Sequence, residues 1–134
     1  MVTTRLLGID FGERKVGLAF YDGFLIEPVG VLSVRNEGKL IEQIREVALR
    51  LQIKKIVFGL PRRGPFLSQA RAFIKKLRKV TDFEVETCRE ILTTKEALVR
   101  MKEAGKSWRK QAQKEDAVAA AILLEDYLAG LKDV

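Results

Sequence analysis

Histidine is absent from this 134-residue sequence, and cysteine occurs once, at Cys88. These absences exclude a disulfide framework, a cysteine-rich zinc site, and every nucleophile or general base that needs histidine within one chain. Any catalysis must therefore rest on carboxylates, hydroxyls, lysine or arginine. For Cys88 we expect the role of a small, buried, reduced side chain rather than a reactive one.

Long apolar stretches are missing as well. The longest apolar run, Ala117 to Leu124, has eight residues, whereas a membrane-spanning helix needs about 20. The first residues also lack the basic segment and apolar stretch of a signal peptide. We expect a cytoplasmic protein. No repeat, low-complexity tract or linker divides the sequence, so residues 1–134 are expected to form a single domain.

The charge of the chain is strongly basic. Lys and Arg number 25 against 18 acids, which gives a net charge of +7 and a pI near 9.7 and favours a polyanionic partner. Residues 61–80 hold seven basic side chains and no acid, and residues 95–114 hold seven against two acids, together with the only tryptophan, Trp108. Either run could be a solvated helix face. Two runs of one sign, one with an aromatic that can stack on bases, favour nucleic acid.

The hydrophobic pattern of the first third is that of β-strands. Strands are predicted over Arg5–Phe11, Val16–Tyr21 and Leu25–Val34, and short turns join them into an antiparallel meander. Pro28 indicates that the third strand lies at an edge of the sheet, because proline cannot donate a hydrogen bond to a strand ladder.

The rest of the chain alternates between helical and extended patterns. The predicted elements are a helix over Leu40–Leu51, a strand over Lys55–Gly59, a helix over Phe66–Leu77, a strand over Phe83–Glu90, and helices over Thr94–Gly105 and Lys114–Leu128, the last capped by Gly130. The last helix is apolar on all sides in its middle, which predicts burial against the sheet. This order predicts an α/β fold with a five-stranded mixed sheet, three antiparallel strands and then two parallel ones, flanked by helices.

Three acids fall where ligands gather in such sheets. Asp10 ends the first strand, Glu90 ends the fifth, and Asp116 opens the last helix. Because the carboxyl ends of parallel strands share one edge of the sheet, we expect these acids to converge there. Each acid alone also has a purely structural explanation: a turn contact for Asp10, a solvated position for Glu90, and helix-dipole complementarity for Asp116.

A convergent cluster of this kind would require cations. Two like charges about 4 Å apart repel by roughly 4 kcal/mol at an effective dielectric of about 20. Carboxylate oxygens favour Mg²⁺ or Mn²⁺. Two such ions, roughly 3.5 to 4 Å apart, can activate a water and stabilise the leaving oxygen of a phosphodiester. Phosphodiester hydrolysis is therefore possible without histidine.

Five segments of the sequence, in order, resemble the YqgF family, whose members are described as Holliday junction resolvases and as pre-16S ribosomal RNA nucleases. The segments are Leu7–Gly12, Val16–Ala19, Val57–Pro61, Leu92–Ala97 and Lys114–Ala120. The resemblance implies a ribonuclease-H-like fold and makes Asp10, Glu90 and Asp116 the catalytic acids and metal ligands. Together with the basic runs it predicts nucleic-acid contacts from Lys15, Arg62, Arg63, Arg89, Thr93, Thr94, Trp108, Arg109, Lys110 and Lys114.

The chain departs from the family pattern at two places. Around the second acid, family members usually read Asp-Glu-Arg, whereas this chain reads Arg89-Glu90-Ile91. The loop after Leu60-Pro61 is also shorter, with Arg62-Arg63-Gly64 in place of a longer loop. Both departures bear on the geometry of substrate binding more than on the fold.

Three functions follow from these patterns. The leading one is a Mg²⁺- or Mn²⁺-dependent endonuclease with two ions, acting in pre-16S rRNA processing or, alternatively, on Holliday junctions, as a monomer or weak homodimer. The second is a nucleic-acid-binding factor with weak or lost catalysis, which the altered residues 89–91 motivate. The third is phosphotransfer, because Gly8–Gly12 also resembles the first phosphate loop of actin-like ATPases and sugar kinases. Those proteins hold nucleotide between two copies of the fold, and this chain has room for one.

Overall fold

The computed structural model describes residues 4–60, 64–89 and 115–132 of the chain. The elements in these ranges are β1 (Leu6–Phe11), β2 (Lys15–Tyr21), β3 (Ile26–Ser33), α1 (Glu37–Arg50), β4 (Lys55–Leu60), α2 (Pro65–Val80), β5 (Glu84–Arg89) and α4 (Glu115–Lys132). Each was predicted from the sequence, with bounds that differ by a few residues. The helix predicted over Thr94–Gly105 lies outside the described residues.

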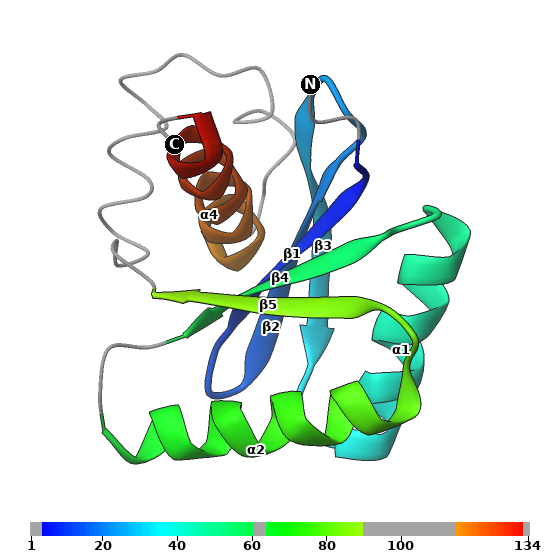
Figure 1. Ribbon diagram of the computed structural model, residues 1–134. Coiled ribbons are helices and arrows are strands. Elements are labelled where there is room, and N and C mark those ends of the chain that lie inside the picture. Colours follow the sequence, from blue (N-terminus) through cyan, green and yellow to red (C-terminus); the bar gives the residue numbers. More distant parts are fainter. Residues whose placement is uncertain (1–3, 61–63, 90–114, 133–134) are drawn as a thin grey trace.

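The five strands form one mixed sheet in the order β3-β2-β1-β4-β5. β1 pairs with β2, and β2 with β3, in antiparallel fashion, while β4 is parallel to both β1 and β5. The predicted arrangement of three antiparallel strands followed by two parallel ones is confirmed. β3, which contains Pro28, lies at an edge of the sheet, as its proline predicted (Figure 1).

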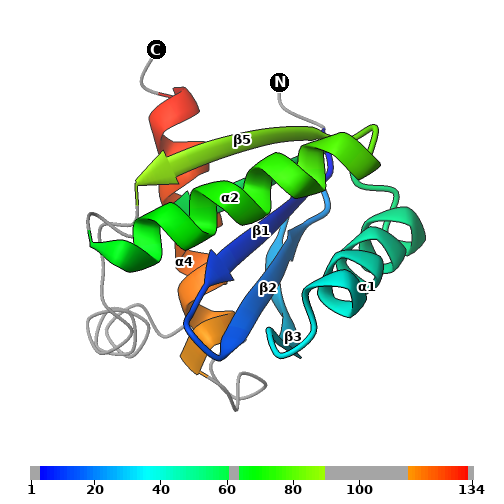
Figure 2. The same ribbon diagram turned by 90° about the horizontal axis from the view of Figure 1, so that it is seen from below.

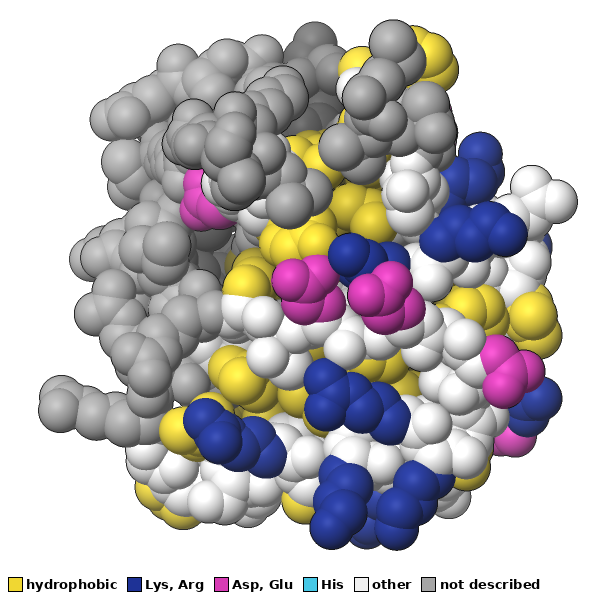
Figure 3. Space-filling model, in the orientation of Figure 1, with side chains coloured by type: hydrophobic (Ala, Val, Ile, Leu, Met, Phe, Trp, Pro, Cys, Tyr) yellow, Lys and Arg dark blue, Asp and Glu magenta, His cyan; other side chains and the backbone are white. Residues whose placement is uncertain are grey.

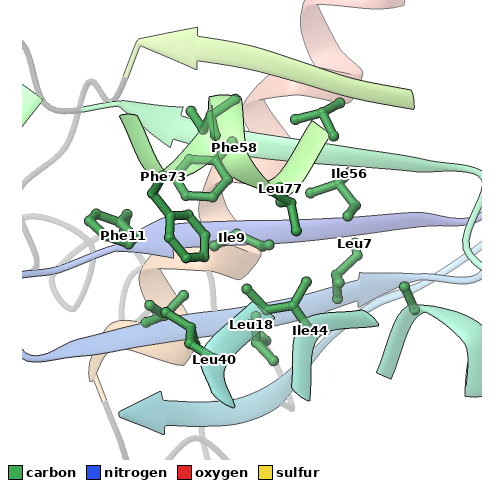
Figure 4. Close-up of a cluster of buried hydrophobic side chains, with 14 of the residues drawn as sticks. Leu7, Ile9, Phe11, Leu18, Leu40, Ile44, Ile56, Phe58, Phe73 and Leu77 are labelled. Carbon is green, nitrogen blue, oxygen red and sulfur yellow. The ribbon is translucent and has the colours of Figure 1, made fainter. Parts of the chain in front are cut away.

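The helices cover both faces of the sheet. α1 and α2 lie on one face and α4 on the other, which gives three layers (Figures 1 and 2). Between the sheet and the first pair of helices lies the larger core, whose aliphatic members pack around rings of Phe11, Phe58 and Phe73 (Figure 4). The centroids of these rings are 5.2 to 6.0 Å apart, a separation at which aromatic rings attract one another.

The opposite face of the sheet is covered by α4. All eight residues from Ala117 to Leu124 are buried, as their apolar character predicted. The predicted cap at Gly130 is wrong, because α4 continues through Gly130 to Lys132. A glycine inside a helix costs only about 1 kcal/mol relative to alanine, so packing of the preceding turns outweighs it. Within the described residues, no helix is both long and apolar enough to cross a membrane.

A close contact between β1 and α4 sets the separation of helix and sheet. A Cβ atom added to Gly8 would lie 2.6 Å from Cγ of Leu124 and 3.1 Å from the carbonyl oxygen of Ala120. Both distances are shorter than a normal carbon contact, and Leu124 is fully buried, so it has little room to move. Only glycine at position 8 therefore allows α4 to lie this close to β1.

The C-terminal half of α4 is held by polar contacts to β4 and β5. Lys55 Nζ donates to Oε2 of Glu86 at 3.1 Å and to the Tyr127 hydroxyl at 3.2 Å, and that hydroxyl donates to the same carboxylate. Hydrogen bonds from Tyr127 and then from Lys55 lower the pKa of Glu86. Figure 3 shows acidic and basic side chains meeting on this surface, beside the apolar side chains of α4.

We predict that Gly8→Ala lowers the free energy of unfolding by about 1 to 3 kcal/mol, because the added methyl group overpacks the contact with α4. Gly130→Ala is the matched control. Its Cβ would meet nothing within 4 Å, and alanine should stabilise the helix by roughly 0.5 to 1 kcal/mol. Urea unfolding followed by circular dichroism measures both values. Equal effects of the two substitutions would refute the tight contact.

We predict that Glu86→Gln destabilises the chain by about 1 kcal/mol at neutral pH, since it removes a partly exposed charge-assisted network. Because the folded-state pKa of Glu86 lies below its ordinary value of 4.5, this stabilisation is complete above that value and is lost as the pH falls through the folded-state pKa.

The difference in unfolding free energy between the parent chain and Glu86→Gln should therefore be constant from about pH 6 to 8 and shrink below about pH 4. Glu84→Gln is the control, because Glu84 lies 3.9 Å from Lys55 and its side chain is 70% exposed. It should cost less than about 0.5 kcal/mol. A pH-independent difference for Glu86→Gln would contradict the role of its charge.

Candidate active site

Asp10 is the central residue of the candidate site. It lies near the carboxyl end of β1, where Gly17 of β2 and Gly59 of β4 are its neighbours across the sheet. Its exposed fraction is 6%, and among the described residues it is the one buried side chain that carries a charge. Ionising a buried carboxylate costs several kcal/mol unless hydrogen bonds, an opposite charge or a metal ion compensate. The position is therefore unusual for a purely structural acid.

The carboxylate of Asp10 belongs to the face of the sheet that α4 covers. Side chains alternate along a strand; Ile9 and Phe11 lie in the core under α1 and α2, whereas Gly8 faces α4. On this face Gly17, Asp10 and Gly59 form one row across three strands. Neither neighbour in the row carries a side chain. The space over Gly59 is occupied by Leu123 of α4, whose Cδ2 atom would lie 3.0 Å from a Cβ added there, so this glycine admits the helix beside Asp10.

Of the other two predicted acids, Asp116 has a described backbone. Asp116 is the second residue of α4, and Ala120, one helical turn later, contacts Gly8 of β1. A helical turn spans about 5.4 Å, and Gly8 is two residues, or about 7 Å, from Asp10. The backbones of Asp10 and Asp116 therefore belong to one region of the molecule. The side chain of Asp116 lies outside the described residues.

Glu90 also lies outside the described residues, but the strand before it is described. Arg89, the last residue of β5, is opposite Leu60 of β4. Because β1, β4 and β5 are parallel, β5 ends at the same edge of the sheet as β1, which Asp10 nearly terminates. β5 therefore ends at the edge where the sequence predicts Glu90. Among the side chains that the structure describes, no group of three potential metal ligands occurs, and the convergence of the three acids stays a prediction.

A tight turn follows Asp10 and joins β1 to β2. The Gly12 amide donates to the carbonyl oxygen of Lys15 at 2.9 Å, so that Glu13 and Arg14 form the tip. A Cβ atom at Gly12 would lie 2.7 Å from the same oxygen, which explains the glycine. The amide of Val34, just after β3, donates to the carbonyl oxygen of Arg14 at 3.0 Å and ties the tip to the end of the edge strand.

A cavity of about 670 Å³ lies between this turn and the end of β3. Its described lining is formed by Glu13, Arg14, Lys15 and residues 31–35. Lys15 is a predicted nucleic-acid contact, whereas the sequence did not single out Arg14 and Arg35. The antiparallel register, which pairs Lys15 with Ser33, brings these residues together. The hairpin between β2 and β3 was visible in the sequence. A bulge in β3 near Val29, however, shifts the register by one residue, so that counting from the turn does not pair Lys15 with Ser33.

The other predicted contact residues are spread more widely. Arg89 ends β5. Those outside the described residues are Arg62, Arg63, Thr93, Thr94, Trp108, Arg109, Lys110 and Lys114.

The rest of the first basic run lies on α2, where its exposed side chains follow the lower border of the face in Figure 3. Two of them serve the fold: Lys76 pairs with Glu37 at 2.8 Å, and Arg78 donates to the carbonyl oxygen of Val85 at 2.9 Å. Since α2 covers the face of the sheet opposite to Asp10 (Figure 2), charge on α2 does not border the candidate site directly.

Other proteins are similar in sequence to this chain over most of its length. A relative from Natranaerobius thermophilus is 32% identical over 131 residues, which cover 92% of this chain and 93% of the relative. A relative from Clostridium botulinum is 31% identical over 134 residues, which cover 95% and 98%. Both carry the name "Putative pre-16S rRNA nuclease".

Solved structures confirm the fold. RuvC of T. thermophilus, in complex with a Holliday junction substrate, matches with a TM-score of 0.59 and 16% identity over 94% of this chain and 95% of that chain. The Fowlpox virus resolvase, in complex with Holliday junction DNA, matches with a TM-score of 0.63 and 13% identity over 96% and 99%. At these identities the likeness shows a ribonuclease-H-like fold alone.

The family model described as "RuvX: Holliday junction resolvase" matches residues 4–130. That range contains β1 with Asp10, the cavity beside the β1–β2 turn, and α4 up to Gly130. The chain is thus a member of the RuvX family, the YqgF family whose motifs its sequence carries.

Proposed function

We propose that the chain is a metal-dependent nuclease that hydrolyses phosphodiester bonds in structured nucleic acid, with the precursor end of 16S rRNA as its substrate. The observation that carries the proposal is the buried Asp10, set between two glycines at the carboxyl edge of a mixed sheet. Membership of the RuvX family and the names of the relatives support the substrate. The cytoplasm is the location that such a substrate implies.

The donor set fits a hard divalent cation. Asp10, Glu90 and Asp116 would supply carboxylate oxygens, which suit Mg²⁺ or Mn²⁺. When bound, such ions lower the pKa of a coordinated water and neutralise charge on the leaving oxygen. The absence of histidine from the chain makes carboxylates the natural choice for this work.

The protein's own contribution is to fix the carboxylates and to exclude water around them. Asp10 is held on a strand that is hydrogen-bonded on both sides, by β2 and by β4. Burial under α4 limits the motion of the strand and keeps its carboxylate in one position. A site built on a central strand is more precise than one built on a loop.

A second candidate substrate is the four-way DNA junction. The description of the family and the Holliday junctions bound by both structural neighbours favour it. Symmetric cleavage of a junction requires two active sites related by a twofold axis, and therefore a dimer. A monomer or weak dimer suits a single cut at an rRNA end. Cleavage of a precursor rRNA end and a synthetic junction, measured side by side, separates the two.

We predict that Asp10→Asn lowers Mg²⁺- or Mn²⁺-dependent cleavage of the preferred substrate by at least about 100-fold, because the loss of one ligand removes several kcal/mol of transition-state stabilisation. Asp82→Asn is the matched control, since Asp82 is exposed and precedes the amino end of β5, away from the candidate site. It should cleave at the parental rate.

Binding of the same substrate in the presence of a chelator should survive in Asp10→Asn, because the substitution removes no positive charge. Full activity of Asp10→Asn would sink the assigned mechanism. Binding without any metal-dependent turnover by the parent chain would instead support the nucleic-acid-binding factor with lost catalysis.

A further inference from the structure

We propose that the cavity between the β1–β2 turn and the end of β3 is a phosphate-binding pocket, which holds the substrate backbone at a phosphate adjacent to the one that is cleaved. Arg14, Lys15 and Arg35 are its cations, and Ser33 is its hydroxyl donor. The proposal rests on the proposed nuclease function, because it assigns a role to the pocket in that reaction.

The three cations are held together by backbone geometry. The Gly12–Lys15 hydrogen bond closes the turn that carries Arg14, and the bond from Val34 to the Arg14 carbonyl joins this turn to β3. The Arg35 amide donates to Oγ of Ser33 at 3.2 Å. Asn36, the next residue, caps α1 and fixes the chain just beyond Arg35. Ordering these cations for a ligand therefore costs little backbone entropy.

The positive charge of the pocket is not balanced within the described part of the chain. Arg14, Lys15 and Arg35 are exposed, and none of them has an acidic partner within 4 Å among the described residues. Lys55 and Lys76, by contrast, do form ion pairs. One acid, Glu13, stands against three cations in the described lining. Such a cluster attracts an anion.

Two residues of the pocket, Lys15 and Ser33, share a face of the sheet with Asp10. Lys15 is two residues from Gly17, which is opposite Asp10, and Ser33 is opposite Lys15. Residues two apart on a strand point to the same face. Diagonal neighbours on adjacent strands are about 7 to 8 Å apart, so Lys15 lies one step along the sheet from Asp10. A backbone whose scissile phosphate is at Asp10 would therefore bring a neighbouring phosphate to this pocket.

The polar side chains of the lining, which lie beside the apolar residues Val31, Leu32 and Val34, fit a phosphodiester backbone rather than a base. Two guanidinium groups can bind phosphate oxygens in a bidentate manner, and a hydroxyl can donate to a third oxygen. The described lining contains no aromatic side chain on which a base could stack. The pocket is therefore expected to position the strand without reading its sequence.

The test is the double substitution Arg14→Gln/Arg35→Gln, with Arg45→Gln/Arg50→Gln as the matched control. The control removes the same charge from the exposed face of α1 and leaves the pocket intact. Binding of a synthetic precursor rRNA end is measured with a chelator present, over a range of salt concentrations. The pocket variant should bind about tenfold more weakly and lose roughly one unit or more of salt slope, and the control should lose much less.

A second measurement locates the contact on the strand. The same RNA is prepared with one neutral methylphosphonate linkage at a time near the cleavage point. The parent chain should lose affinity at one linkage beside the scissile bond, and the pocket variant should be insensitive to that change. Circular dichroism and thermal unfolding verify that both variants are folded.

The outcomes separate the two proposals. A large loss confined to the pocket variant supports the pocket, whether or not the parent chain cleaves, because binding is measured without metal. Equal losses in both variants, or none in either, overturn it in favour of a diffuse basic field. Failure of the parent chain to bind the RNA also overturns it. The nuclease proposal is decided separately, by turnover with metal.

Discussion

The contact between Gly8 of β1 and the Ala120–Leu124 turn of α4 determines how the candidate site is built. It brings an apolar helix so close to the central strand that no side chain fits between them. Asp10, two residues along that strand, is buried on the same face. A carboxylate in this position could not be tolerated by apolar packing alone, because its desolvation costs several kcal/mol. The same contact therefore stabilises the fold and gives Asp10 a poorly solvated position.

The C-terminal part and the middle of α4 are held by different interactions. Toward its C-terminal end, Tyr127 joins Lys55 and Glu86 in a partly exposed hydrogen-bonded network on β4 and β5. In its middle, the helix packs through apolar contacts, and Leu123 lies against Gly59 next to Asp10. The first turn, which carries Asp116, is thus aligned by contacts made further along the helix. This division leaves the start of α4 available for chemistry while its later turns maintain the packing.

The basic charge of the chain is likewise divided between structure and binding. On α2, Lys76 and Arg78 are engaged by the fold, whereas the cations around the β1–β2 turn have no acidic partner among the described residues. Net charge alone would give both groups the same meaning. Their different environments show why the position of a charge, and not the total, identifies a candidate surface for binding phosphate.

The sequence by itself determined the secondary structure, the mixed sheet and the position of Asp10 near the end of the first strand, because apolar periodicity, glycines and a family motif are local signals. It misplaced the end of α4 at Gly130, since the cost of a helical glycine is small beside packing that no local pattern records. It did not single out Arg14 and Arg35, which line the cavity together with Lys15. These side chains meet only because β2 pairs with β3 in a register shifted by a bulge. The tertiary structure alone decided this register and the approach of α4 to Gly8, because both depend on contacts between residues far apart in the chain.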